Sequence, residues 1–406
     1  MRNVVFAAPF LMDATLRFVR AAASLPGVRL ALVTQEPLER VPEDLRAKLD
    51  AHWRVADGLD PAQIEAAVVQ LARGMGNVSR LLGTLEQLQT PLGEVRRRLG
   101  IEGMDAATAE NFRDKARMKD VLRAAGVPCA RHRKVATLDE GRAFAAATGF
   151  PLVVKPPAGA GAKATFRVDT MEELEQALRA TGLGAGRETQ IEEFVVGEEH
   201  SFDTVSVGGR HVWHSLSRYS PTPLDVLRNP WIQWCVMIPR EVDHPRYDDI
   251  RKVAFRALDA LGMRSGVSHM EWFRRRDGSI AVSEVGGRPP GAQICSLVSY
   301  ANDFDFYAAW ARVAVFDEFT PPERKYACGA AYLRGQGEGR VAAIRGLEDA
   351  QRELGGLVVE AKLPVAGQAA SGTYEGDGYV ILRHPETAVV ERALQRLVSL
   401  VRVELR

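Results

Sequence analysis

The first hundred residues alternate between short apolar runs and amphipathic stretches. The apolar runs predict strands at residues 3–9, 29–34, 52–57 and 78–84, of which 52–57 is the weakest. The stretches between them place apolar side chains at helical spacing and predict helices over 14–25, 61–75 and 85–100. Strands that alternate with helices indicate a parallel sheet covered on both faces. Residues 1–104 are therefore expected to form an α/β domain. No glycine-rich dinucleotide fingerprint follows its first strand, so it need not bind a nucleotide.

A second region, residues 105–190, shows clear helix start and stop signals. A helix is predicted over 109–125, closed by a glycine and followed by a proline two residues later. Thr137 and Thr170 each stand three residues before a glutamate, the pattern of a capping box, and each opens a further helix. Between those helices, FPLVVKPP and TFRV read as strands on either side of a glycine-rich stretch.

Two more regions complete the chain. Residues 191–318 are rich in predicted strands. Residues 319–406 place strands around two predicted helices, at about 346–354 and 386–400, which is typical of a small α+β subdomain. The fold class expected for the whole chain is thus α/β and α+β, in several domains.

The stretch HMEWFRRRDGSIAVSEVGGRPPG, residues 269–291, is predicted to be a hairpin that turns at Asp277-Gly278. If those two residues are the whole turn, Glu271 lies directly opposite Glu284. Facing carboxylates at about 5 Å repel by roughly 3 kcal/mol at an effective dielectric near 20. A divalent cation such as Mg²⁺ neutralises such a pair well, because hard cations prefer carboxylate oxygens.

Other interpretations of the hairpin stay open. Nearby arginines could neutralise the two acids, or a bulged turn could place them on opposite faces. Arg288, in the constrained loop GGRPPG, would put a permanent cation beside the metal, which suits a phosphoryl or acyl-phosphate group. His269 is expected on the same face as Glu271, where a histidine is more often packed than a ligand.

The glycine-rich stretch 158–164 also has two interpretations. Gly159 to Ala164 matches GxGxxA, but a strand follows it where a dinucleotide fingerprint requires a helix. A glycine-rich loop between strands can still cover phosphates with its backbone N–H groups, and Lys155 would direct a cation at the same place. The alternative is a flexible hairpin with a solvated lysine.

Composition narrows the class of protein. The chain has 406 residues, 46% hydrophobic and 26% charged, with a net charge of +1, so several domains are expected and no nucleic-acid surface is indicated. Its four cysteines are irregularly spaced, which favours free thiols and a cytoplasmic location. The first twenty residues read as a buried strand and helix rather than a signal peptide. No apolar run is long enough to predict a membrane span.

Taken together, these motifs resemble the ATP-grasp superfamily, and in particular its carboxylate–amine ligases, relatives of L-amino acid ligases, biotin carboxylase and D-alanine–D-alanine ligase. The resemblance runs from about residue 111 to 291 and is carried in order by DKARMKDVLRAAGVP, LVVKPPAGAGAKA, IEEFVVGEEHSFD and the hairpin. It implies a Rossmann-like N-terminal domain, an ATP-grasp fold of two α+β subdomains that grip ATP (105–190 and 191–318), and the C-terminal subdomain 319–406. ATP and Mg²⁺, with Mn²⁺ as an alternative, are the implied cofactors.

The resemblance also implies site residues. Lys115 would contact the α-phosphate, Lys155 the phosphates and adenine, and Gly159 and Gly161 would lie over the β/γ-phosphates. Glu192 would accept from the adenine amino group, the backbone of Phe194 and Val195 would contact the ring edge, and Glu199 would hold the ribose. The metal ligands would be Glu271 and Glu284, with Arg288 as the acyl-phosphate arginine and catalytic residue.

Two positions depart from the family pattern. Glu284-Val-Gly286-Gly-Arg288 has a glycine where the usual Glu-x-Asn-x-Arg motif has asparagine, which leaves open whether one or two metal ions bind. The loop carries Ala162 where serine is common, and Lys163 is the expected substitute phosphate donor.

The implied activity is amide-bond formation through an acyl phosphate, with a small carboxylate and an amine as substrates. The aromatic-rich segment 213–240 lies between the stretch IEEFVVGEEHSFD and the hairpin and is expected to line the substrate pocket. The candidates are Arg218, Tyr219, Arg228, Trp231 and Trp234. Packing in the core is the alternative for each aromatic residue. The rival functions are a biotin-carboxylase-like reaction and a catalytically silent ATP-binding regulatory protein. A homodimer is expected only by analogy.

Overall fold

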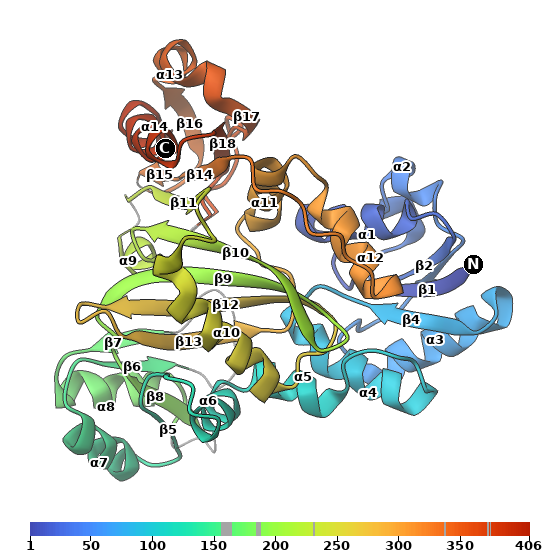
Figure 1. Cartoon of the computed structure of the whole chain (residues 1–406), viewed down its shortest axis with the longest axis horizontal. Coiled ribbons are helices and arrows are strands. Elements are labelled where there is room, and N and C mark those ends of the chain that lie inside the picture. Colours follow the sequence, from blue (N-terminus) through green and yellow to red (C-terminus); the bar gives the residue numbers. More distant parts are fainter. Residues whose placement is uncertain (156–164, 184–187, 230–231, 337, 372, 374) are drawn as a thin grey trace.

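We analysed a computed structural model that describes residues 1–155, 165–183, 188–229, 232–336, 338–371, 373 and 375–406 (Figure 1). Its N-terminal part is a parallel sheet of four strands in the order β3-β2-β1-β4. The strands are β1 (Arg2–Ala7), β2 (Val28–Thr34), β3 (Ala51–Arg54) and β4 (Val78–Leu82). The predicted parallel α/β arrangement is confirmed.

Both faces of this sheet are covered by helices, because consecutive side chains of a strand point to opposite faces. Val5 and Val33 pack in a core with α3 (Pro61–Met75) and α4 (Gln89–Leu99). Phe6 and Leu32 pack in another core with α1 (Asp13–Ala23) and with α12 (Phe306–Phe316), a helix from much later in the chain (Figure 1). The N-terminal sheet is thereby tied to the rest of the molecule.

The predicted helix over 109–125 is wrong in one respect, because two helices occupy this stretch. They are α5 (Ala106–Arg113) and α6 (Lys115–Ala124), separated at Asp114. Asp114 has an extended backbone, and its side chain accepts hydrogen bonds from the N–H groups of Ala116 and Arg117. It therefore ends the first helix and caps the second, so that Lys115 is the first residue of a new helix.

A small antiparallel sheet follows, in the order β5-β8-β6-β7. Its strands are β5 (His132–Val135), β6 (Leu152–Lys155), β7 (Phe166–Val168) and β8 (Thr189–Glu193). The helices α7 (Leu138–Thr148) and α8 (Met171–Ala180) form one core with it. Thr137 makes the predicted capping box with Glu140. Thr170 caps α8 as predicted, but the Glu173 carboxylate accepts from the N–H of Asp169 instead of the cap residue.

The largest sheet has eight antiparallel strands in the order β13-β12-β9-β10-β11-β14-β18-β17. They are β9 (Gly197–Val207), β10 (Arg210–Ser220), β11 (Trp234–Ile238), β12 (Gly266–Arg275), β13 (Ile280–Gly286), β14 (Ala327–Leu333), β17 (Val358–Lys362) and β18 (Gly378–His384). One face packs on α10 (Asp248–Leu261), and the other on α11 (Ile294–Asn302) and α12.

Residues after 318 contribute to two sheets. Three strands of the eight-stranded sheet, β14, β17 and β18, come from this part of the chain. The strands β15 (Gly335–Gln336), β16 (Val341–Arg345) and β19 (Arg402–Leu405) form a separate small sheet. The two predicted helices are α13 (Leu347–Leu354) and α14 (Thr387–Leu400). The remaining short helices are α2 (Glu43–Arg46), α9 (Pro223–Arg228), η1 (Leu38–Arg40), η2 (Glu86–Leu88), η3 (Pro245–Tyr247) and η4 (Gly355–Leu357). Within the described residues, no helix combines the length and the apolar character that crossing a bilayer requires.

Candidate functional site

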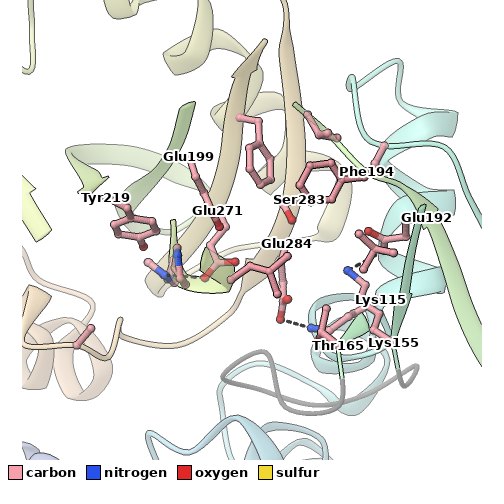
Figure 2. A pocket seen from close by; sticks show the side chains of 18 of the residues that line it. Lys115, Lys155, Thr165, Glu192, Phe194, Glu199, Tyr219, Glu271, Ser283 and Glu284 are labelled. Atoms are coloured by element: carbon pink, nitrogen blue, oxygen red, sulfur yellow. Dashed lines mark ion pairs between the residues drawn. The ribbon is translucent and has the colours of Figure 1, made fainter. Parts of the chain in front are cut away.

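A cavity lies between the small sheet and the edge of the eight-stranded sheet, and Figure 2 shows its lining. The small sheet supplies β6 and β8, the large sheet supplies residues of β9, β10, β11, β12 and β13, and the start of α6 closes one side. Most of the residues expected from the sequence meet here: Lys115, Lys155, Glu192, Phe194, Val195, Glu199, Tyr219, Trp234, Glu271, Glu284 and Arg288.

Glu271 and Glu284 lie directly opposite one another on β12 and β13, as expected, and Figure 2 shows both side chains at the cavity. The turn that joins the strands differs from the prediction. Arg275 pairs with Ser279, and Gly278 adopts φ +83°, so three residues form the loop instead of two. The register nearest the turn is therefore shifted by one residue. A bulge at Ser283 restores it, which places Ser283 and Glu284 side by side at the cavity wall.

The two facing acids have different surroundings. Lys115 forms an ion pair with Glu284. Burial alone would raise the pKa of Glu284, but the charges of Lys115 and Lys155 outweigh it and lower the pKa. Burial, together with the charge of Glu284, raises the pKa of Glu271. Among the described residues, Glu271 has no ion pair with a lysine or arginine; its basic neighbour is His269, whose Nε2 atom lies 3.9 Å from the carboxylate.

This carboxylate pair fits a divalent cation that is shared with a ligand. Its oxygens are hard donors, and a cation would relieve the repulsion that raises the pKa of Glu271. No group of three or more potential ligand side chains gathers anywhere in the described part of the chain. The two glutamates would therefore supply part of the coordination shell, and the rest would come from phosphate oxygens and water, as is common for Mg²⁺.

Arg288 follows β13 and is held by a residue from the N-terminal part. Its Nη2 atom lies 2.8 Å from Oε2 of Glu86, and its Nη1 atom donates to the carbonyl of Pro289 at 3.0 Å. Burial would lower the pKa of Arg288, but Glu86 and the cavity glutamates raise it. The guanidinium is therefore a fixed cation near the paired acids. Sequence reasoning missed Glu86, which no local motif marks.

The carboxylate of Glu192 is held by two lysines. Its Oε2 lies 2.6 Å from Nζ of Lys119, and its Oε1 lies 2.8 Å from Nζ of Lys155. Although burial favours the neutral acid, both lysines outweigh it and lower the pKa of Glu192 to about 2. Lys119 was not among the residues expected from the sequence. Its position one helical turn after Lys115, on the same face of α6, is the signal that could have found it.

A second buried pair lies beside the acids. The Nδ1 atom of His269 is 2.7 Å from Oδ1 of Asp203, a fully buried residue on β9. Burial would lower the pKa of His269, but Asp203 reverses this and raises it. His269 is thus a hydrogen-bonded histidine held by a partner on the neighbouring strand.

The remaining expected residues differ in their contacts and in whether they reach the cavity. The N–H of Phe194 donates to Pro151, and the guanidinium of Arg167 lies over its ring. Burial, with the charge of Glu271 added, raises the pKa of Glu199 well above its usual value. Arg218 does not line this cavity, because it is paired with Glu391 and Tyr247 on the other side of the sheet. The residues Gly159, Gly161, Lys163 and Trp231 lie outside the described residues, as does the side chain of Arg228.

The sequence was compared with those of known protein families and known proteins. Residues 120–299 match the ATP-grasp domain family. An uncharacterized protein, y4rH, from Sinorhizobium fredii is 25% identical over 84% of this chain and 72% of its own length. An L-arginine-specific L-amino acid ligase from Bacillus subtilis is 24% identical over 66% of this chain and 67% of its own.

The fold agrees with that match. The crystal structure of an L-amino acid ligase from Bacillus licheniformis superposes with a TM-score of 0.79 at 20% identity, covering 100% of this chain and 99% of the other. Its agreement extends over all the parts described above, including the N-terminal sheet and the C-terminal strands. The chain therefore contains an ATP-grasp domain at residues 120–299, and over its whole length it shares the fold of an L-amino acid ligase.

Proposed function

We propose that this protein is a carboxylate–amine ligase that activates a small carboxylic acid with ATP and joins it to an amine. The observation that supports this most directly is the convergence of the facing pair Glu271 and Glu284 with Arg288 in one cavity. Paired acids suit a metal-bound polyphosphate, and a fixed guanidinium suits the phosphoryl group in transfer. Similarity to an L-amino acid ligase favours amino acids or related small acids as substrates.

In this proposal the cavity binds ATP between the two sheets. Lys115 and Lys155 both line the cavity and, with Arg288, would supply cations to the phosphates. Glu192 and the backbone of Phe194 and Val195 would hold the adenine, and Glu199 the ribose hydroxyls. Mg²⁺ held by Glu271 and Glu284, with Mn²⁺ as the alternative, would neutralise phosphate charge during transfer.

The chemistry that these residues favour has two steps. A carboxylate is a poor acyl donor, so one of its oxygens first takes the γ-phosphoryl group, which gives an acyl phosphate and ADP. The amine nitrogen then attacks the acyl carbon, and phosphate leaves. Arg288 would stabilise the transferring phosphoryl group and then the oxyanion that forms on the acyl carbon. The protein's share is positioning and charge stabilisation, with no covalent enzyme nucleophile.

The walls of the cavity also suggest a substrate type. Besides its charged residues, the lining includes Tyr219, Leu224, Trp234 and Ile294, together with Pro223 and Ala292. Apolar and aromatic walls favour substrates with an apolar side chain, because the transfer of such a side chain from water into an apolar pocket lowers the free energy. We therefore expect the preferred acid or amine to carry an aliphatic or aromatic group.

The test is a screen for condensation products. Purified full-length protein is incubated with ATP, Mg²⁺ and pairs of amino acids or small acids with amines, and the products are identified by mass spectrometry while ADP release is followed. The expected result is ADP release that needs both an acid and an amine, with a product equal in mass to the two minus water. Bicarbonate-dependent ADP release without an amine would instead favour the carboxylase reaction. Nucleotide binding without turnover on any pair would favour a regulatory role.

A further inference from the structure

The helix α6 presents two lysines, one turn apart, to two different parts of the cavity. Lys115 pairs with Glu284 on the large sheet, and Lys119 pairs with Glu192 on the small sheet. Residues at positions i and i+4 of a helix lie on the same face, so α6 joins the part of the cavity around Glu284 to the part around Glu192. Lys115 is accounted for by the proposed function, whereas Lys119 is not.

Lys119 cannot be a direct nucleotide ligand in this arrangement. Its side chain is fully buried, with 0% exposed, and its ammonium contacts the Glu192 carboxylate at 2.6 Å. Lys155 contacts the other oxygen of the same carboxylate at 2.8 Å, yet Lys155 lines the cavity. One carboxylate therefore has an inner lysine that faces no solvent and an outer lysine that a ligand can reach.

Moving Lys155 away and removing Lys119 would have different effects on Glu192. A buried carboxylate that loses its only cation is strongly destabilised, because burial penalises an uncompensated charge. With Lys119 in place, Lys155 can turn toward phosphate oxygens while Glu192 keeps one cation. Without Lys119, Lys155 would be the one remaining cation paired with Glu192 among the described residues, and it would have to stay.

We propose that Lys119 is a positioning residue, a fixed counter-ion of Glu192 that frees Lys155 to bind the nucleotide's phosphates. This inference rests on the proposed nucleotide site. It assigns Lys119 a role that depends on the phosphates of the ligand and not on its adenine, since Glu192 stays in place with either lysine.

The pKa values of Lys119 and Glu192 agree with a role for Lys119 as a charged partner of Glu192. Burial lowers the pKa of Lys119 to about 8, and the nearby charge of Lys155 adds to the effect, while Glu192 opposes it. At neutral pH Lys119 is thus still mostly charged, and the two lysines together keep Glu192 ionised. Glu192 thus has two cationic partners, whereas Lys119 and Lys155 share a single carboxylate.

The test compares the binding of ADP and of adenosine to the full-length protein by calorimetry, with Mg²⁺ present. K119M should weaken ADP binding by about 10-fold to 100-fold and adenosine binding by less than about threefold. The control is K362M on β17, because Lys362 is an exposed lysine paired with Asp13 at 3.0 Å outside the cavity. It should leave both affinities unchanged.

A second background separates a charge effect from loss of structure. In E192Q there is no carboxylate to neutralise, so K119M/E192Q should bind ADP within about threefold of E192Q. This comparison also serves if K119M alone does not fold. Equal losses for ADP and adenosine in K119M, or the same loss of ADP affinity in both backgrounds, would overturn the proposal. Wild-type protein that binds neither ligand would contradict the nucleotide site itself, a result separate from these.

Discussion

Arg288 and Glu86 form an ion pair at 2.8 Å that links the loop after β13 to the N-terminal α/β part, 202 residues earlier in the chain. The Glu86 side chain is buried, with 7% exposed, so its carboxylate is shielded from solvent and fixes where the Arg288 guanidinium lies. An arginine that only balanced surface charge would have no need of such a partner.

Replacing this arginine should separate binding from turnover. We expect R288A to lower turnover on the order of 10²-fold, as for loss of a transition-state donor, while ATP affinity changes only a few-fold. E86Q should show a smaller loss, because the amide still accepts a hydrogen bond but no longer fixes the guanidinium by charge. Steady-state ADP release with ATP binding measured separately checks both. R276A, in the hairpin loop, is the control, and unchanged turnover in R288A would refute the assigned role.

Removing either facing acid should change the metal requirement. E271Q and E284Q each keep the shape of the side chain but lose a charged oxygen donor, so we expect the Mg²⁺ concentration for half-maximal ADP release to rise by about tenfold or more. Titration of Mg²⁺ at saturating ATP measures this. E198Q is the matched control, because Glu198 is exposed on the neighbouring strand β9. A Mg²⁺ requirement that stays at the wild-type value in both variants would count against metal ligation.

The hairpin shows what sequence reasoning could and could not reach. Strand periodicity and the Asp277-Gly278 turn signal were enough to predict that Glu271 faces Glu284. The details were wrong, because a third loop residue and the bulge at Ser283 shift the register twice and cancel. Both shifts are decided by backbone hydrogen bonds that leave the apolar pattern of the strands almost unchanged.

Other differences have similar physical reasons. The break at Asp114 was missed because the residues on both sides continue a helical pattern, although aspartate is a strong helix cap. Partners such as Glu86 for Arg288, or Asp203 for His269, come from distant parts of the chain, and only the fold brings them together. The apolar pattern predicted the elements, and the element order predicted the parallel and strand-rich regions, but no local pattern encodes a contact across 202 residues.

Adding a methyl group at two glycines of the N-terminal part should change the stability of the protein in opposite directions. A Cβ at Gly93, in α4, would meet the backbone nitrogen of Ala106 at 2.5 Å, where α4 packs against α5. G93A should therefore lower the free energy of unfolding by about 1–3 kcal/mol, as for overpacking. A Cβ at Gly74, exposed in α3, meets nothing within 4 Å, so G74A should raise stability by up to about 1 kcal/mol. Denaturant unfolding measures both, and a destabilised G74A would contradict the model of an open helix surface.

The buried carboxylate of Glu192 should make stability depend on pH in the acid range. Its pKa is lowered from 4.5 to about 2 in the folded state, so between these values the unfolded chain binds a proton that the folded chain does not. Stability from this group is present above about pH 4.5 and is lost as pH falls toward 2, by an amount on the order of 3 kcal/mol. Lys119, whose pKa is lowered only to about 8, stays protonated throughout this range and adds no pH dependence there.

The measurement is the difference in free energy of unfolding between wild type and E192Q at a series of pH values below 6. We expect the difference to be largest near pH 6 and to shrink steadily below pH 4.5, because the glutamine cannot titrate. E140Q is a useful comparison: the pKa of Glu140 is also lowered, by hydrogen bonds from the N–H groups of Ala136 and Thr137, but that carboxylate is exposed at the start of α7 and its effect should be small. A difference between wild type and E192Q that stays constant from pH 6 down to about 2.5 would mean that the two lysines do not hold the carboxylate in its charged form.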